Sequence, residues 1–444
     1  MSWIKFLIDE IGLSSLYKSN KDVYFIILLR MIRLIGFGST SLILVLYLKS
    51  LDIREELIGF FLTLTFIGDL VLSFVISLYT DLIGRKRILL SCSLLMGLTG
   101  LSFVIFDNFY ILAAVAMLGI LTPSGGEVGP FRTIEQSSIA SLVTHEFRSD
   151  IYAWYLFLGS FCHALGSILA GCIIDSTLNA GFNKVESYKF VFLSYTILGG
   201  VSCILCMFLS NGIEIEQDKA TVNETSQLLQ EEGEIEPISS QKKKGFKFLP
   251  HLTPDIYSIV IKLSLLFGLD SFASSLTPIS WQSYYINNKF NLSSSFLGSI
   301  FFTTGIIASF TALGSTSLNK RIGAVKTMVF THLPASILLA CVPLPKSLYV
   351  TLTILILRSS TSSMDTAPKH VFLATLIADN NRTAVFGFVN VVKTLSQAIG
   401  PTIVGILTKN NLQWVSFIIA GSLKSIYDIG ILVTFITYNK HVVH

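Results

Sequence analysis

The residues best suited to chemistry in this 444-residue chain are charged side chains inside long apolar stretches. A charge near the centre of a lipid bilayer costs at least ~2.5 kcal/mol unless it is paired or hydrated. Charges that gather in such stretches therefore mark a path for ions or solutes. Fourteen are present: Arg30, Arg33, Asp69, Glu127, Arg132, Glu135, Lys262, Asp270, Arg358, Asp365, Lys369, Lys393, Lys424 and Asp428.

Four carboxylates in this set are candidates for proton coupling. Burial favours the neutral form of a carboxyl group, whereas a neighbouring arginine favours the carboxylate, so a buried acid near a base can exchange a proton. The alternative for each is a permanent structural ion pair or a hydrogen bond. The candidates are Asp69, Glu135, Asp270 and Asp365.

The other charges predict the lining of a solute path. Glu127 lies between Pro123 and Pro130 in a glycine-rich stretch, which predicts a kinked helix. Lys393 could contact an anionic solute or pair with Asp365. The candidates are Arg30, Arg33, Glu127, Arg132, Arg358, Lys369 and Lys393. Lys424 and Asp428, four residues apart, are expected to pair with each other.

Long apolar helices are needed to hold these charges. The chain is 52% hydrophobic and 14% charged, and its mean hydropathy is +0.67, whereas soluble proteins carry roughly 25% charge. Apolar stretches of ~20 residues can cross a hydrocarbon core of ~30 Å. We expect an all-α membrane protein with twelve spans, at 23–48, 57–79, 88–106, 110–142, 151–174, 189–210, 256–286, 294–317, 327–345, 347–377, 384–408 and 413–438.

The distribution of Lys and Arg predicts the orientation. Seventeen fall on the side that holds both termini and seven on the opposite side, so the termini are expected to be cytosolic. The organisation expected is a cytosolic N-terminal segment (1–22), a six-helix half (23–210), a disordered cytosolic linker (211–255), a second six-helix half (256–438) and a cytosolic C-terminus (439–444).

The two halves carry related sequences. Residues 125–171 match residues 361–405 without a gap when shifted by 234 positions. A repeat of this length, with charges inside its apolar segments, is typical of transporters built from two related halves. Glu135 aligns with Lys369, which suggests an ion pair across the space between the halves.

The turn between the second and third spans carries a motif. Asp81 is followed by Gly84, Arg85 and Lys86. The glycine permits a chain reversal, the acid can approach a helix N-terminus, and the basic residues favour the cytosolic face.

These four positions match the major facilitator superfamily signature Gly-x-Leu-Ala-Asp-Arg-x-Gly-Arg-Lys in register, and the chain resembles that family over its whole length. The resemblance implies two pseudo-symmetric six-helix halves, alternating access, and a cytosolic latch formed by Asp81, Gly84, Arg85 and Lys86. It also implies that the first, fourth, seventh and tenth helices line the cavity, and ten of the fourteen charges fall on these helices. Within the family the chain is similar to the microbial and fungal drug:proton antiporter branch, although Gly400 and Pro401 lie in the eleventh span rather than in the fifth.

The function expected is therefore secondary active transport of a small solute, coupled to protons, by a monomer in the lipid bilayer. An uncoupled facilitator and a non-transporting sensor are the alternatives. Basic residues outnumber acids by eight to six within the spans, which favours a solute with a negative group. No GxxxxGK[ST] loop occurs, so neither an enzyme nor an ATP-driven pump is expected. We expect no cofactor, no metal and no nucleic-acid partner.

A short motif in the linker predicts a route within the cell. Glu224 followed by Leu228 and Leu229 resembles the acidic dileucine signal that sorting adaptors read. The alternative is a chance match in a loop rich in Glu and Leu. The expected location is the plasma membrane or the vacuolar membrane.

Overall fold

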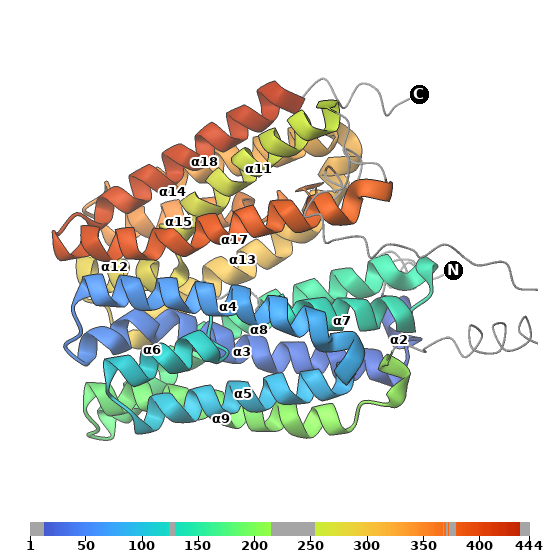
Figure 1. Cartoon of the computed structure of the whole chain (residues 1–444). Helices are drawn as coiled ribbons and strands as arrows, with labels where there is room; N and C mark the ends of the chain where they lie inside the picture. The colour runs from blue at the N-terminus through green and yellow to red at the C-terminus, as the bar shows by residue number, and fades with distance from the viewer. Residues whose placement is uncertain are drawn as a thin grey trace, which may run out of the picture.

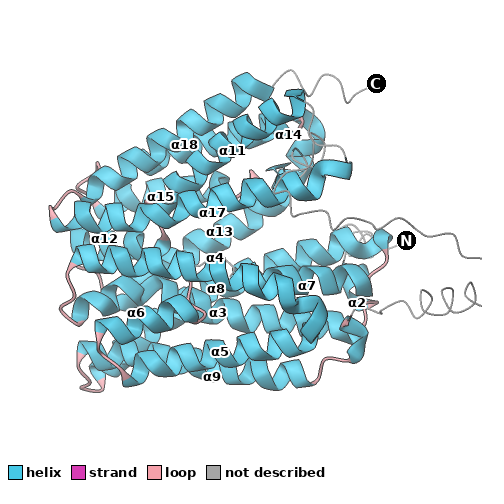
Figure 2. Ribbon diagram, viewed as in Figure 1, coloured by secondary structure: helices cyan, strands magenta, loops and turns pink. Residues whose placement is uncertain are grey.

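The computed structural model describes residues 13–123, 129–214, 254–366, 368–369, 372 and 379–435. Every regular element in these ranges is a helix (Figure 2). The first half of the chain forms α2 (Leu13–Tyr17), α3 (Lys21–Ser50), α4 (Glu55–Ile83), α5 (Arg85–Ile105), α6 (Phe109–Leu118), α7 (Gly129–Leu142), α8 (His145–Asn179), α9 (Lys184–Met207) and the 3-10 turn η1 (Asn211–Ile213).

The second half repeats this arrangement. Its helices are α11 (Pro254–Ser275), α12 (Ile279–Phe290), α13 (Ser294–Ile322), α14 (Ala324–Cys341), α15 (Leu348–Ser362), α17 (Asp379–Lys409) and α18 (Gln413–Phe435). Within the described residues, ten helical stretches are long and apolar enough to cross a membrane, and Phe109–Leu118 and Leu348–Ser362 are shorter apolar helices. The expected all-α fold of twelve spans in two related halves is confirmed.

The fourth expected span differs from the prediction. Residues 110–142 were expected as one kinked helix, but α6 ends at Leu118 and α7 begins at Gly129. The chain leaves the helix at Gly119, whose backbone is extended, and the Thr99 hydroxyl lies where a side chain at Gly119 would be. The fourth span is therefore two short helices rather than one.

The seventh and tenth spans are also interrupted. The predicted span 256–286 divides into α11 and α12 around Pro278, whose missing N–H cannot continue the helical bonding. In the predicted span 347–377, α15 ends at Ser362, a short turn follows, and a further helical stretch includes Lys369. Three of the four helices that the family resemblance assigns to the cavity are thus broken near their middle.

The two ends of the bundle differ in how the halves meet. We call the end that holds α2 and the last turn of α18 the terminal face, and the opposite end the far face (Figure 1). At the far face one hydrophobic core includes residues of both halves, among them Phe61, Trp281 and Val404. Toward the terminal face each half has a core of its own. The halves are therefore joined at the far face and separate at the terminal face.

Close backbone packing produces the far-face contact. A Cβ added at Gly59 of α4 would lie 2.5 Å from the carbonyl oxygen of Pro401 in α17, and one added at Gly171 of α8 would collide with that of Ser294. The carboxylate of Asp175 accepts hydrogen bonds from the backbone amides of Ser294 (3.2 Å) and Ser295 (2.8 Å) at the start of α13. Since α8 and α13 belong to different halves, Asp175 helps to hold them together there.

Candidate functional site

The first half contains a buried ion pair that joins three helices. Arg33 of α3 donates two hydrogen bonds to Glu135 of α7, at 2.7 and 2.8 Å. The hydroxyl of Tyr155 in α8 donates a third to the same carboxylate, at 2.8 Å. The Glu135 side chain is 0% exposed and that of Arg33 is 3% exposed. The pairing has the fork geometry that makes Arg–carboxylate bonds strong.

Aromatic rings extend this first-half cluster. The guanidinium of Arg30 lies 3.9 Å from the centre of the Tyr155 ring, and that of Arg33 lies 4.0 Å from the centre of the Phe131 ring. Cations over aromatic faces are stabilised most where water is excluded. We refer to Arg30, Arg33, Glu135 and Tyr155 as the first-half cluster.

The second half holds a branched ionic cluster instead. Asp270 of α11 accepts from Lys424 of α18 at 2.8 Å and from Lys369 at 3.0 Å. Lys369 also lies 3.2 Å from Asp365, and Lys424 donates to the hydroxyl of Ser274 at 2.7 Å. We refer to Asp270, Asp365, Lys369 and Lys424 as the second-half cluster; its side chains are 9 to 17% exposed.

A histidine–carboxylate pair lies behind the second-half cluster. His332 of α14 contacts Asp428 of α18 through Nδ1 at 2.9 and 3.0 Å, and Ser336 donates to the same carboxylate at 3.1 Å. The predicted Lys424–Asp428 pair is therefore wrong. Both residues lie on α18 four positions apart, but Asp270 and His332 on neighbouring helices provide better-placed partners.

Two half-buried cations have no carboxylate partner among the described residues. Lys393 of α17 and Arg358 of α15 are half-buried, and among the described residues neither forms an ion pair. Lys393 lies within electrostatic reach of Lys369 and Asp270 in its own half and of Arg132 in the other half. The proposed pair of Lys393 with Asp365 does not form, because Asp365 pairs with Lys369. Lys393 and Arg132 thus bring positive charge from both halves within electrostatic reach of each other.

The suggested ion pair between Glu135 and Lys369 is also wrong. Each residue is satisfied inside its own half, Glu135 by Arg33 and Lys369 by Asp270 and Asp365. The repeat predicted related positions for the two residues, but partners on adjacent helices lie at contact distance, where opposite charges attract more strongly than distant ones.

Of the remaining sequence candidates, some lie outside the two clusters and others lie outside the described residues. Asp69 of α4 is half-buried and accepts a hydrogen bond from Ser73 at 3.3 Å. Lys262 is exposed. Glu127 and the sorting motif Glu224, Leu228 and Leu229 lie outside the described residues. Over the described ranges, no group of three or more His, Cys, Asp or Glu side chains is placed to hold a metal ion.

The motif of the turn between α4 and α5 packs within the first half. Gly84 has φ +100°, a conformation that favours glycine. Glu214 accepts hydrogen bonds from the backbone amides of Arg85 (2.7 Å) and Lys86 (3.2 Å) at the start of α5, where a helix N-terminus favours an anion. The Arg85 side chain donates to the Ser141 hydroxyl at 3.1 Å. Asp81 lies in α4, and its side chain is outside the described set.

Two members of these networks were not among the sequence candidates. Tyr155 carries no charge, so the pattern of intramembrane charges does not indicate it, and it has no distinguishing signal among fifteen tyrosines. His332 lies in an expected span, and a histidine within an apolar stretch is the signal that indicates it.

The sequence and the fold of this chain are similar to those of known membrane proteins. The family model described as Major Facilitator Superfamily matches residues 26–260 and 263–441. The chain is 32% identical over 405 residues to the uncharacterised membrane protein YJR124C of Saccharomyces cerevisiae, covering 90% of each. Its fold is similar to that of a D-xylose-proton symporter (TM-score 0.67, 13% identity, 92% of this chain and 97% of that one). It is also similar to the human organic anion transporter MFSD10 (TM-score 0.60, 15% identity, 93% and 100%).

Proposed function

This chain belongs to the major facilitator superfamily, and from that premise we propose that it is a proton-coupled secondary transporter of a small organic solute with a negative group. The observation that carries the proposal is the pair of buried ionic clusters, one in each half. Between the halves, Lys393 lies within electrostatic reach of both Arg132 and the second-half cluster.

The second-half cluster supports proton coupling. Lys369 is shared between Asp270 and Asp365, so adding a proton to Asp365 leaves Lys369 paired with Asp270. Glu135, by contrast, accepts three hydrogen bonds, two of them from Arg33. Protonating Glu135 would leave the buried Arg33 without its counter-ion, which is costly. Of these two acids, we therefore assign the proton-carrying role to Asp365.

The excess of positive charge supports an anionic solute. Lys393 is a half-buried cation without an ion pair among the described residues, and a solute carboxylate or phosphate would compensate it. One structural relative is described as an organic anion transporter, which is compatible with an anionic solute. Another is described as a proton symporter, which is compatible with proton coupling, although D-xylose itself is neutral.

The separation of the halves at the terminal face supports alternating access. From the separate cores of the two halves at the terminal face, we infer that this arrangement faces the side that holds the termini, which the excess of Lys and Arg indicates is the cytosol. Rocking the halves about the far-face contacts would open the path to the other side.

The test is transport in liposomes that contain a pH-sensitive dye. Pools of organic anions are added outside, and proton movement and solute uptake are followed together. Asp365→Asn should lower solute-driven proton flux at least tenfold while exchange of labelled solute continues. The matched control is Asp52→Asn, because Asp52 is exposed and has φ +57°, a conformation that asparagine tolerates.

Other outcomes would change the assignment. Solute flux without proton movement in the wild type would make the protein an uncoupled facilitator. Solute binding without flux would favour a sensor. Proton flux unchanged in Asp365→Asn would remove Asp365 from the mechanism.

A further inference from the structure

A pocket on the far face lies apart from both ionic clusters. Its volume is ≈ 420 Å³, and it is lined by Leu46, Lys49, Ser50, Asn183, Lys184, Val185, Tyr284, Asn287 and Asn288. These residues come from the end of α3, the start of α9 and the end of α12. A cavity of roughly 300–1,000 Å³ is the size that small ligands use.

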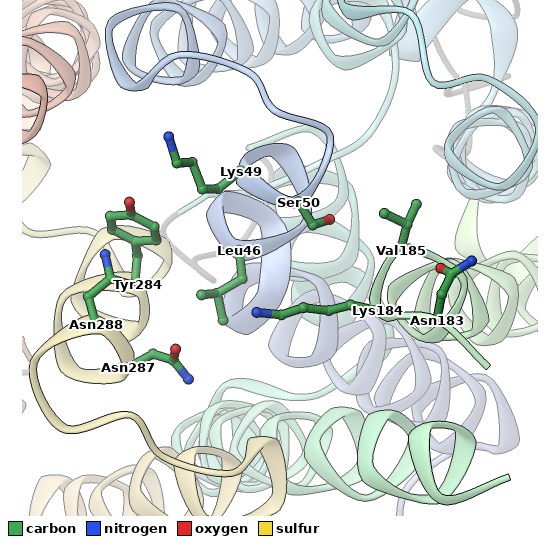
Figure 3. Close-up of a pocket in the computed structure, with 9 residues that line it drawn as sticks. All are labelled: Leu46, Lys49, Ser50, Asn183, Lys184, Val185, Tyr284, Asn287 and Asn288. Atoms are coloured by element: carbon green, nitrogen blue, oxygen red, sulfur yellow. The ribbon is translucent and has the colours of Figure 1, made fainter. Parts of the chain in front are cut away.

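The pocket spans the boundary between the two halves. Figure 3 shows Lys184 extending from α9 across Leu46 toward Asn287 on α12, with Asn288 and Tyr284 on the same wall. Lys184 and Asn183 belong to the first half, and the three α12 residues belong to the second. A ligand held by both walls would therefore bind only while the far face is closed.

The charges around the pocket leave one cation available. Lys49 is paired with Glu55 at 2.6 Å, and Glu186 is occupied by the backbone amide of Asn183 in the capping box of α9. Lys184, however, makes no ion pair or side-chain hydrogen bond with any described residue. The start of α9 adds the partial positive charge of a helix N-terminus.

The remaining lining is suited to hydroxyl groups. Asn183, Asn287, Asn288 and Ser50 carry amide and hydroxyl groups. Asn287 donates to the carbonyl oxygen of Leu292, the Asn183 oxygen accepts from the amide of Glu186, and Ser50 donates to the carbonyl oxygen of Tyr47. The Asn287 oxygen, the Asn183 amide nitrogen and the lone pairs of Ser50 remain to bond a ligand. Leu46 and Val185 supply the apolar surface. One available cation among several neutral polar groups matches a small molecule with one negative charge and several hydroxyls.

We propose that this far-face pocket binds a polyhydroxylated organic monoanion, through Lys184 of the first half and Asn287 and Asn288 of the second, and thereby stabilises the far-face-closed arrangement. Two sources offer this chemistry: a soluble sugar acid, and the headgroup of phosphatidylglycerol. The proposal is independent of the transported solute, because it concerns a separate site and is tested without transport.

The experiment measures thermal unfolding of the full chain in nanodiscs of phosphatidylcholine. The soluble probes are gluconate, glucose and glucosamine, which are similar in size and differ in charge. Gluconate should raise Tm by roughly 2 °C or more, and glucose and glucosamine should not. The lipid arm replaces part of the phosphatidylcholine with phosphatidylglycerol, which should raise Tm in the same way if the headgroup is the occupant.

Three variants make the result specific to the pocket. Lys184→Gln should abolish the stabilisation, and Lys184→Arg should retain most of it. Lys346→Gln is the matched control, because Lys346 is also exposed and lies between α14 and α15, away from the pocket-lining residues. Since Lys184 is exposed, these variants are expected to fold, which the unliganded Tm checks directly.

Each outcome supports or overturns the far-face site. Stabilisation by gluconate that depends on Lys184 supports a soluble ligand, and stabilisation by phosphatidylglycerol that depends on Lys184 supports a lipid headgroup. Stabilisation that is equal in wild type and Lys184→Gln overturns the site. The absence of stabilisation in both arms overturns it as well.

Discussion

The two buried ionic clusters compensate their charges inside an apolar helix bundle in different ways. In the first-half cluster one carboxylate, fully buried, accepts a fork from Arg33 and a third bond from Tyr155. In the second-half cluster Asp270 and Lys369 each have two partners of opposite charge, and the side chains keep some exposure. A closed pair resists any change of charge, whereas a branched network can lose one contact and keep the rest. Under the proposed function, the first-half cluster stabilises the fold and the second-half cluster exchanges a proton.

The largest effect should come from breaking the closed pair. Glu135→Gln leaves the buried Arg33 without its counter-ion, and losing one partner of a buried pair costs about 3–5 kcal/mol. The midpoint of denaturant-induced unfolding in micelles should fall accordingly. The double variant Arg33→Met with Glu135→Leu should recover much of the loss, because it removes both charges. If Glu135→Gln unfolds at the same denaturant concentration as the wild type, the Arg33–Glu135 pair does not stabilise the fold.

An intermediate effect is expected at the centre of the branched network. Asp270→Asn removes the acid that Lys369 and Lys424 share, but Lys369 keeps Asp365 and Lys424 keeps Ser274. A hydrogen bond to a charged group is worth about 1.5–3 kcal/mol, so a loss of about 2 kcal/mol is expected in the same unfolding measurement. A loss larger than that of Glu135→Gln would reverse the comparison between the clusters.

Among the cluster variants, the smallest effect is expected at the edge of the second-half cluster. Asp365→Asn leaves Lys369 bonded to Asp270 at 3.0 Å, so the loss of stability should be about 1 kcal/mol. The same variant is expected to lose proton flux. The comparison of the two clusters therefore predicts that Asp365→Asn changes proton flux strongly and the unfolding free energy only slightly. Asp52→Asn should change the unfolding free energy by less than about 0.5 kcal/mol, as expected for an exposed site.

The sequence predicted the spans and the charges well because both are local signals. An apolar stretch interrupted by Arg33, Glu135 or Asp270 is visible without any knowledge of packing. The pairings were not visible, because Arg33 and Glu135 are 102 residues apart and their contact depends on how α3 crosses α7. The Lys424–Asp428 pattern was misleading for the same reason, since helix spacing says nothing of the stronger partners on α11 and α14.

The breaks in the helices were only partly predictable. The stretch around Pro123 and Pro130 indicated a kink, and the structure instead ends one helix at Leu118 and begins another at Gly129. A proline shows that helical bonding is weakened, but the surroundings decide whether the helix bends or stops. At Gly119 the neighbouring Thr99 hydroxyl leaves no room for a side chain, and that contact is a property of the folded bundle.

The contact between α8 and α13 has a mechanical consequence. The two helices approach closely at Gly171 and Ser294, and again at Ser167 and Gly298. Farther along, the rings of Phe157 and Phe310 lie 5.1 Å apart, so α8 holds α13 over more than half of its length. The part of α13 beyond Phe310, up to Ile322, is about 18 Å long at 1.5 Å per residue, and it acts as a short lever. Bending α13 by roughly 10° at Phe310 would carry its end through about 3 Å at this length. The contacts between the halves from Gly171 to Phe157 can therefore stay packed while the end of the same helix moves.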